Sequence, residues 1–168
     1  MSEIQIIHNE IDNIEKKESQ EDLRDKILLF QEGLSRFPNA QLNDQDDCPL
    51  KHSFGNGIYM REIFIPKGKI IVGKIHRHSH PNVLLKGEVS VVTEFDGVKR
   101  LKAPLSMISE AGTKRVVYAH EDTVWLTFHN VGEERDLNKI EEIVITKTYD
   151  ELPDFCKKFI EVKVEESK

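Results

Sequence analysis

The chain has 168 residues, with 30 acidic and 24 basic side chains and a formal net charge of −6 at pH 7. This length is typical of one domain with a sizeable core, and the excess of acid works against binding a nucleic-acid polymer. No apolar run approaches the ~20 residues that span a bilayer, the polar residues 1–5 do not resemble a signal peptide, and only two cysteines, Cys48 and Cys156, are present. We therefore expect a cytoplasmic protein with free thiols that binds neither nucleic acid nor membrane.

The first predicted element is an amphipathic helix within residues 10–37. Leu23, Ile27, Phe30 and Leu34 recur at steps of four and three, and Ser19 could cap its start. Such an apolar stripe packs either against the rest of the chain or against a second subunit, and recognition of another partner is the alternative. Residues 1–52 then form a helical arm and a loop.

The middle of the chain predicts a β domain over residues 53–131. Short strand-like runs cover residues 58–65, 69–78, 83–93, 98–101, 104–108, 115–118 and 123–129, separated by turn residues. Asp96-Gly97 predicts a two-residue type I′ hairpin turn, which requires positive φ at both positions. Many short strands at regular spacing indicate a β-sandwich or a closed barrel.

Residues 132–168 predict a helical extension packed on that barrel. Asp136 can cap a helix through Leu137, Ile140 and Ile143, and a short strand at residues 144–145 and a second helix at residues 153–160 follow. We find no internal repeat.

Three histidines at alternate positions, His76, His78 and His80, are the most informative feature for chemistry. In an extended strand their imidazoles project from one face and could converge on one metal ion or one anion. A strand that stays regular through Pro81 allows this, whereas a turn beginning at Ser79 moves His80 away. Imidazole nitrogen suits Zn, Fe, Ni or Mn. His120 and His129, near the end of the β region, are further candidates.

This segment resembles the first metal-binding motif of the cupin superfamily, G-x5-H-x-H-x3,4-E-x6-G. His76 and His78 match its two histidines, Gly87 matches its closing glycine, and His80 takes the place of the glutamate. Residues 110–115 align with the second motif and put Arg115 at the position of its last metal ligand. The texture is similar to that of short single-domain cupins encoded in bacteriophage and bacterial genomes.

The resemblance implies a mainly β fold, a cupin-like jelly-roll barrel with an N-terminal helix and a C-terminal helical extension. It implies a divalent transition metal on His76 and His78, with His80 as third ligand, and a homo-oligomer, most simply a dimer.

Arg115 indicates an anion inside such a barrel, because a guanidinium without an anionic partner is costly to bury. The partner could be a carboxylate of the chain, from Glu62, Glu88 or Glu110, or the phosphate or carboxylate of a ligand. Three aromatic residues, Tyr59, Tyr118 and Trp125, could stack on such a ligand, although ordinary packing also uses aromatic side chains.

Three functions remain open at this point. The first is a cupin that binds a small anionic metabolite or a nucleotide-like ligand beside a histidine-bound metal. The second is a metal-dependent oxygenase, isomerase or lyase, and the third is a phage assembly or regulatory protein that uses the barrel as a scaffold. No G-x-S-x-G, P-loop or H-E-x-x-H signature is present, and a fold of this kind hosts all three functions.

Overall fold

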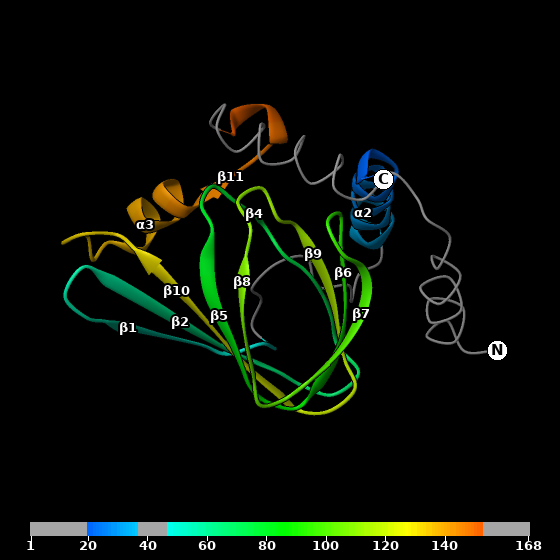
Figure 1. Ribbon diagram of the computed structural model, residues 1–168, viewed down its shortest axis with the longest axis horizontal. Helices are drawn as coiled ribbons and strands as arrows, with labels where there is room; N and C mark the ends of the chain where they lie inside the picture. The colour runs from blue at the N-terminus through cyan, green and yellow to red at the C-terminus, as the bar shows by residue number, and fades with distance from the viewer. Residues whose placement is uncertain (1–19, 37–46, 153–168) are drawn as a thin grey trace.

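The computed structural model describes residues 20–36 and 47–152, and strands dominate it (Figure 1). The strands are β1 (Leu50–Phe54), β2 (Ile58–Ile65), β3 (Ile70–Val72), β4 (Ile75–His76), β5 (His80–Lys86), β6 (Glu88–Thr93), β7 (Gly97–Lys102), β8 (Leu105–Ser109), β9 (Arg115–Ala119), β10 (Thr123–Asn130) and β11 (Ile145–Thr146). The helical elements are α2 (Gln20–Ser35), α3 (Leu137–Val144) and the single 3-10 turn η2 (Tyr149–Glu151).

Two antiparallel sheets face each other across the core. The larger has the strand order β1-β2-β10-β5-β8 and the smaller has the order β3-β9-β6-β7, so that neighbours in each sheet are mostly distant in sequence. This is the predicted mainly β, cupin-like jelly roll with an N-terminal helix and a C-terminal extension. Among the described residues, no helix is both long and apolar enough to cross a membrane.

The core between the sheets follows from alternation along the strands. In β10 every second residue is buried from Thr123 to His129, and Trp125 lies within this series. Buried side chains of both sheets form one apolar cluster that includes Ile63, Leu84, Val89, Val91, Val117 and Trp125. The inward face of each strand therefore positions whatever polar side chains it also carries.

Gly87 makes the corner where the chain passes from β5 in one sheet to β6 in the other. Its φ is +95°, and a Cβ built there would lie 2.5 Å from Thr123 Oγ1 and 2.8 Å from the carbonyl oxygen of Asp122. Only glycine satisfies both the conformation and the close approach. The glycine of the first cupin motif thus has a physical reason in this chain.

Helix α2 packs on the outer face of the smaller sheet. Leu23 and Ile27 are buried, and Ile27 contacts Val72, Val92 and Val116, with Phe30 and Leu34 packed at the edge. The predicted amphipathic stripe therefore covers the chain's own barrel. The cap proposed at Ser19 and the helix predicted at residues 153–160 lie outside the described residues.

The described strands differ from the predicted ones in three places. The runs 69–78 and 83–93 are each divided in two, and β1, which was not predicted, pairs with β2. The hairpin between β6 and β7 is confirmed, but its two-residue turn is wrong. Thr93 pairs with Gly97, so the turn has three residues, 94–96, and Gly97 supplies the positive φ of +66°.

Helix α3 lies over one end of the barrel, on the side of β10 (Figure 1). Asp136 caps it as predicted, accepting hydrogen bonds from the backbone N–H groups of Asn138 and Lys139. Ile140 and Val144 are buried against Tyr59 and Val131. Directly after α3, β11 pairs with β4, placing Ile145 opposite His76.

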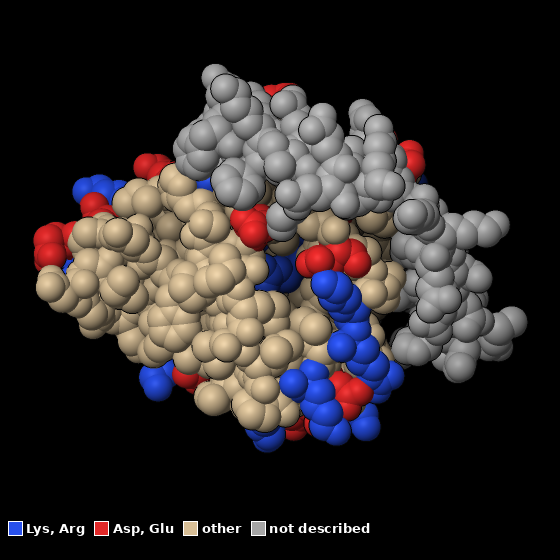
Figure 2. Space-filling model, in the orientation of Figure 1, with Lys and Arg blue, Asp and Glu red and all other residues tan. Residues whose placement is uncertain are grey.

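Charged side chains of both signs gather on the face shown in Figure 2, over β6 and β7. There Glu88 pairs with Arg100 and Lys102, and Asp96 pairs with Lys99. Because the two signs are interspersed, this surface is mixed in charge rather than uniformly basic.

Candidate metal and anion site

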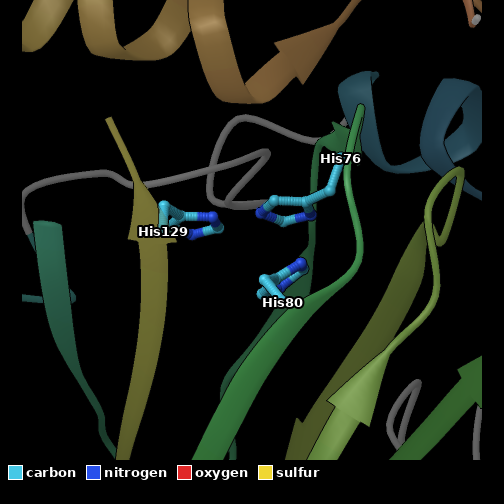
Figure 3. A group of neighbouring side chains, drawn as sticks. All are labelled: His76, His80 and His129. Carbon is cyan, nitrogen blue, oxygen red and sulfur yellow. The ribbon is translucent and has the colours of Figure 1, made fainter. Parts of the chain in front are cut away.

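Three histidines from three strands converge near the α3 end of the barrel (Figure 3). His76 comes from β4, His80 from β5 and His129 from β10, and one ring nitrogen of each lies within 4.8 Å of the other two. The ring centroids of His76 and His80 are 4.3 Å apart, and those of His80 and His129 are 4.6 Å apart. Segments far apart in sequence thus build one cluster of nitrogen donors.

A bend between β4 and β5 decides which histidines take part. Residues 77 and 78 leave the extended conformation, so His78 is exposed while His80, at the start of β5, returns to the interior. The backbone N–H of Arg77 donates to the carbonyl oxygen of Val144 at 2.8 Å, which holds the bend against the end of α3. The structure therefore brings together His76 and His80, and leaves the side chain of His78 outside the cluster.

All three rings lie in surroundings that favour the neutral imidazole. Burial, followed by the neighbouring His80 and Arg115, holds the pKa of His76 well below its ordinary value. Burial also lowers the pKa of His80 to about 3 and that of His129 to about 4. Neutral imidazole is the form that binds metal ions.

The hydrogen bonds of the cluster fit a metal ion. His80 donates from Nδ1 to the carbonyl oxygen of His78 at 3.1 Å, which leaves the lone pair of Nε2 toward the cluster. Nε2 of His80 and Nδ1 of His76 are buried and have no hydrogen-bond partner. Three neutral nitrogens, two of them buried and unpaired, form a donor set suited to a divalent transition metal.

Arg115 lies beside the histidines within a polar network. Its Nη1 donates to Asn82 Oδ1 at 3.1 Å, its Nη2 donates to Ser109 Oγ, and its guanidinium carbon is 5.3 Å from the ring centroid of Trp125. Asn82 is fully buried and also accepts a hydrogen bond from Trp125 Nε1 at 3.1 Å. These contacts hold the guanidinium in one orientation.

The charge of Arg115 is not neutralised by a carboxylate close to it. Within the part of the chain that the structure describes, no acidic side chain lies within ion-pair distance of Arg115, and Glu88 pairs with Arg100 and Lys102 instead. Burial lowers the pKa of Arg115 to about 10 and Glu94 opposes that change, so the side chain is cationic at neutral pH.

The histidines and Arg115 open onto a cavity of about 320 Å³ between the sheets and α3. Ile140, Glu141 and Val144 line it from the helix, and Glu141 is paired with Lys74 of the barrel at 2.7 Å. The volume is at the lower end of the range for small-molecule cavities, about 300–1,000 Å³.

The predicted stacking residues are distributed on two faces. Tyr59 and Trp125 line the cavity, and the ring centroid of Tyr59 is 6.1 Å from that of His129. Tyr118 alternates with Val117 on β9, and its ring lies edge-on against His120, at 4.8 Å. Tyr118 is therefore on the opposite face of its strand from the cavity, and His120 lies with it, bonded to Ser90.

Several polar residues of the site were not singled out in the sequence: His52, Arg61, Asn82, Ser109 and Thr127. His52 Nδ1 is hydrogen-bonded to the hydroxyl of Tyr59 at 2.7 Å. Arg61 and Thr127 stand opposite each other on β2 and β10. Alternation along β10 was the available signal, because it puts Trp125, Thr127 and His129 on one face.

Comparison with solved structures supports the fold. Salicylate 1,2-dioxygenase from Pseudoaminobacter salicylatoxidans, in an adduct with gentisate, is similar with a TM-score of 0.50 and 11% identity over 75% of this chain, which spans only 35% of that enzyme. KdgF from a Halomonas species is similar with a TM-score of 0.44 and 15% identity, covering 51% of this chain and 82% of KdgF. A cupin 2 domain-containing protein from Halorhodospira halophila has a TM-score of 0.45 and 14% identity, covering 64% and 82%.

No protein-family model and no curated protein matches the sequence. At these levels of identity the structural likeness concerns the fold alone. Together with the two-sheet topology it shows that the chain has the cupin fold.

Proposed function

We propose that the protein binds a divalent transition metal through His76, His80 and His129, and holds a small organic anion beside that metal in the cavity. The observation that carries the proposal is the pair of buried, unpaired nitrogens, His76 Nδ1 and His80 Nε2, in a three-histidine cluster at the cavity. When bound, a metal such as Zn, Fe, Ni or Mn supplies positive charge and open coordination positions.

Arg115 supports the anionic character of the ligand. Two of its five N–H donors bond Asn82 and Ser109, and its charge has no acidic partner within ion-pair distance in the described part of the chain. A carboxylate or phosphate bound in the cavity would provide that partner. Arg61 also lines the cavity, and its charge contributes to the lowered pKa of His129.

A metal-dependent enzyme is the second candidate, and one observation favours it. Three protein ligands leave further coordination positions on a metal, and in this chain those positions would face the cavity. A salicylate 1,2-dioxygenase shares the fold. Turnover of a bound anion, abolished by the His129→Ala substitution, would establish this reading.

Metal analysis of matched variants tests the proposal. The purified protein is reconstituted with zinc, desalted and analysed for bound metal, alongside His129→Ala, His78→Ala and His120→Ala. We expect about one equivalent in the wild type, at least a tenfold weaker affinity in His129→Ala, and little change in the other two variants. His78 is exposed and His120 is bonded to Ser90, away from the cluster.

The same experiment separates the two possible ligand sets. Loss of zinc in His78→Ala with retention in His129→Ala would favour the set His76, His78 and His80, and would contradict the set proposed from the cluster. Wild-type protein that retains no transition metal and shows no thermal stabilisation by any of them would reject the metal site.

A further inference from the structure

The cavity changes from polar to apolar along the barrel axis, and three neighbouring strands show the same change. On β2 the inward residues run from Tyr59 and Arg61 to Ile63 and Ile65. The register places His129 opposite Tyr59, Thr127 opposite Arg61, and Trp125 opposite Ile63. On β1, His52 lies opposite Arg61 and Leu50 lies opposite Ile63. The change therefore occurs at one level of the barrel.

The facing sheet continues this division. Arg115 of β9 lies near the histidines, and Val117, two residues further along the strand, lines the apolar part together with Ile71. Ile71, Val117, Ile63 and Trp125 belong to the central apolar cluster, so the deep wall of the cavity is continuous with the core. A hydroxyl-rich molecule placed against this wall would lose its hydrogen bonds to water without replacement.

Thr127 marks the boundary between the two parts. Its hydroxyl is buried, lines the cavity and has no hydrogen-bond partner. Buried hydroxyls without a partner are uncommon, because the loss of hydration is not compensated. The group stands at the level of Arg61, one inward position from Trp125, where the head of a ligand would meet its body.

We propose that the ligand is a compact carboxylic acid with an apolar body, and that Thr127 and Arg115 bind its carboxylate. This inference rests on the proposed anion-binding function and narrows it to one chemical class. The carboxylate lies at the level of Thr127, Arg61 and Arg115, and the apolar body packs on Ile63, Val117 and Trp125. Polyhydroxylated acids, sugar phosphates and nucleotides do not suit the deep wall.

Calorimetric titration of the wild type with three probes tests the ligand class. Benzoate carries a carboxylate on an apolar ring, gluconate carries the same charge on a polyhydroxylated chain, and inorganic phosphate has no body. We expect benzoate to bind at least tenfold more tightly than gluconate or phosphate, in both the zinc-loaded and the metal-free protein. Gluconate or phosphate binding as tightly as benzoate would overturn the inference and leave anion binding intact. Failure of all three probes to bind would reject the proposed anion function itself.

Two substitutions test the assigned walls. Thr127→Val removes the unpaired hydroxyl with little change of shape, so the free protein should be equally or more stable while benzoate binds about tenfold more weakly. A purely structural role for Thr127 predicts unchanged benzoate affinity. Val117→Thr puts a hydroxyl on the apolar wall and should weaken benzoate at least about fivefold, with phosphate unaffected.

Val91→Thr is the matched control for Val117→Thr. Val91 is buried in the same cluster and stands opposite Val117 in the register, but it does not line the cavity. Both variants should lose similar stability, and only Val117→Thr should lose benzoate affinity. An equal loss of benzoate affinity in the two variants would contradict the placement of the apolar body against Val117.

Discussion

A buried carboxylate in the β6–β7 turn, Glu94, makes the stability of this protein depend on pH. Its side chain is completely buried beneath α2 and η2. It accepts hydrogen bonds from the backbone N–H of Lys114 at 3.3 Å and from the Tyr149 hydroxyl at 3.4 Å, and Arg24 Nε is 3.9 Å away. Burial raises the pKa of Glu94 from 4.5 to about 7, although the contacts with Arg24 and Lys114 oppose that change.

The sign and size of the effect follow from proton linkage. Below pH 4.5 both folded and unfolded chains hold the proton, and the favourable contribution of neutral Glu94 is complete. Between pH 4.5 and about 7 the folded chain keeps the proton that the unfolded chain loses. The free energy of unfolding therefore falls as pH rises through this interval, by a total of about 3 kcal/mol.

The Glu94→Gln variant isolates this contribution. Urea unfolding is followed at pH 5, 6, 7 and 8 through the fluorescence of Trp125, the one tryptophan of the chain, which is buried. We expect the wild type to lose most of the 3 kcal/mol relative to the variant between pH 5 and pH 8. A constant offset from lost contacts does not matter, because only the slope is diagnostic.

The histidine cluster titrates in an overlapping range with the opposite sign. The lowered pKa values of His80 and His129, about 3 and about 4, make the free energy of unfolding fall as pH drops below 6.5. Both proteins share this effect, so it cancels in the difference.

The Glu88→Gln variant is the control for the Glu94 measurement. A hydrogen bond from Arg100 lowers the pKa of Glu88, which is therefore ionised throughout the tested range, and its difference from the wild type should not change with pH. A difference between wild type and Glu94→Gln that stays constant or grows from pH 5 to pH 8 would refute the reasoning.

Three further predictions concern the corner glycine, the guanidinium and self-association. Gly87→Ala should cost about 1–3 kcal/mol more in urea unfolding than Gly97→Ala, because both have positive φ but only Gly87 lacks space for a Cβ; equal costs would show that the corner can relax. Arg115→Met should weaken benzoate binding by about thirtyfold or more while leaving zinc content unchanged, and a loss below about fivefold, measured by calorimetry, would place the guanidinium outside the anion site. We still expect a dimer, with twice the 19.4 kDa chain mass in light scattering, through the exposed Leu85 and Ile108 on the outer face of the larger sheet. Ile108→Asp should then be monomeric, and a monomeric wild type at high micromolar concentration would contradict the prediction.

The sequence by itself determined the elements whose signals are local. Alternation of apolar residues predicted the strands from residue 58 to residue 129, the cap residue Asp136 predicted the start of α3, and the stripe of α2 predicted its buried face. The strand β1 escaped because its burial depends on β2 rather than on its own pattern. The turn at residues 94–96 was misread because the register between β6 and β7 determines the number of residues in the turn.

Only the tertiary structure decided how the site is composed. Spacing placed His76, His78 and His80 on one face of an extended strand, but the bend at residues 77–78 turns His78 outward, and the pairing of β4 with β11 holds that bend in place. His129 joins the cluster from fifty residues away, through antiparallel pairing that no local pattern specifies. The chemistry available to the site was thus visible in the residue types, whereas the choice of ligands depended on long-range contacts.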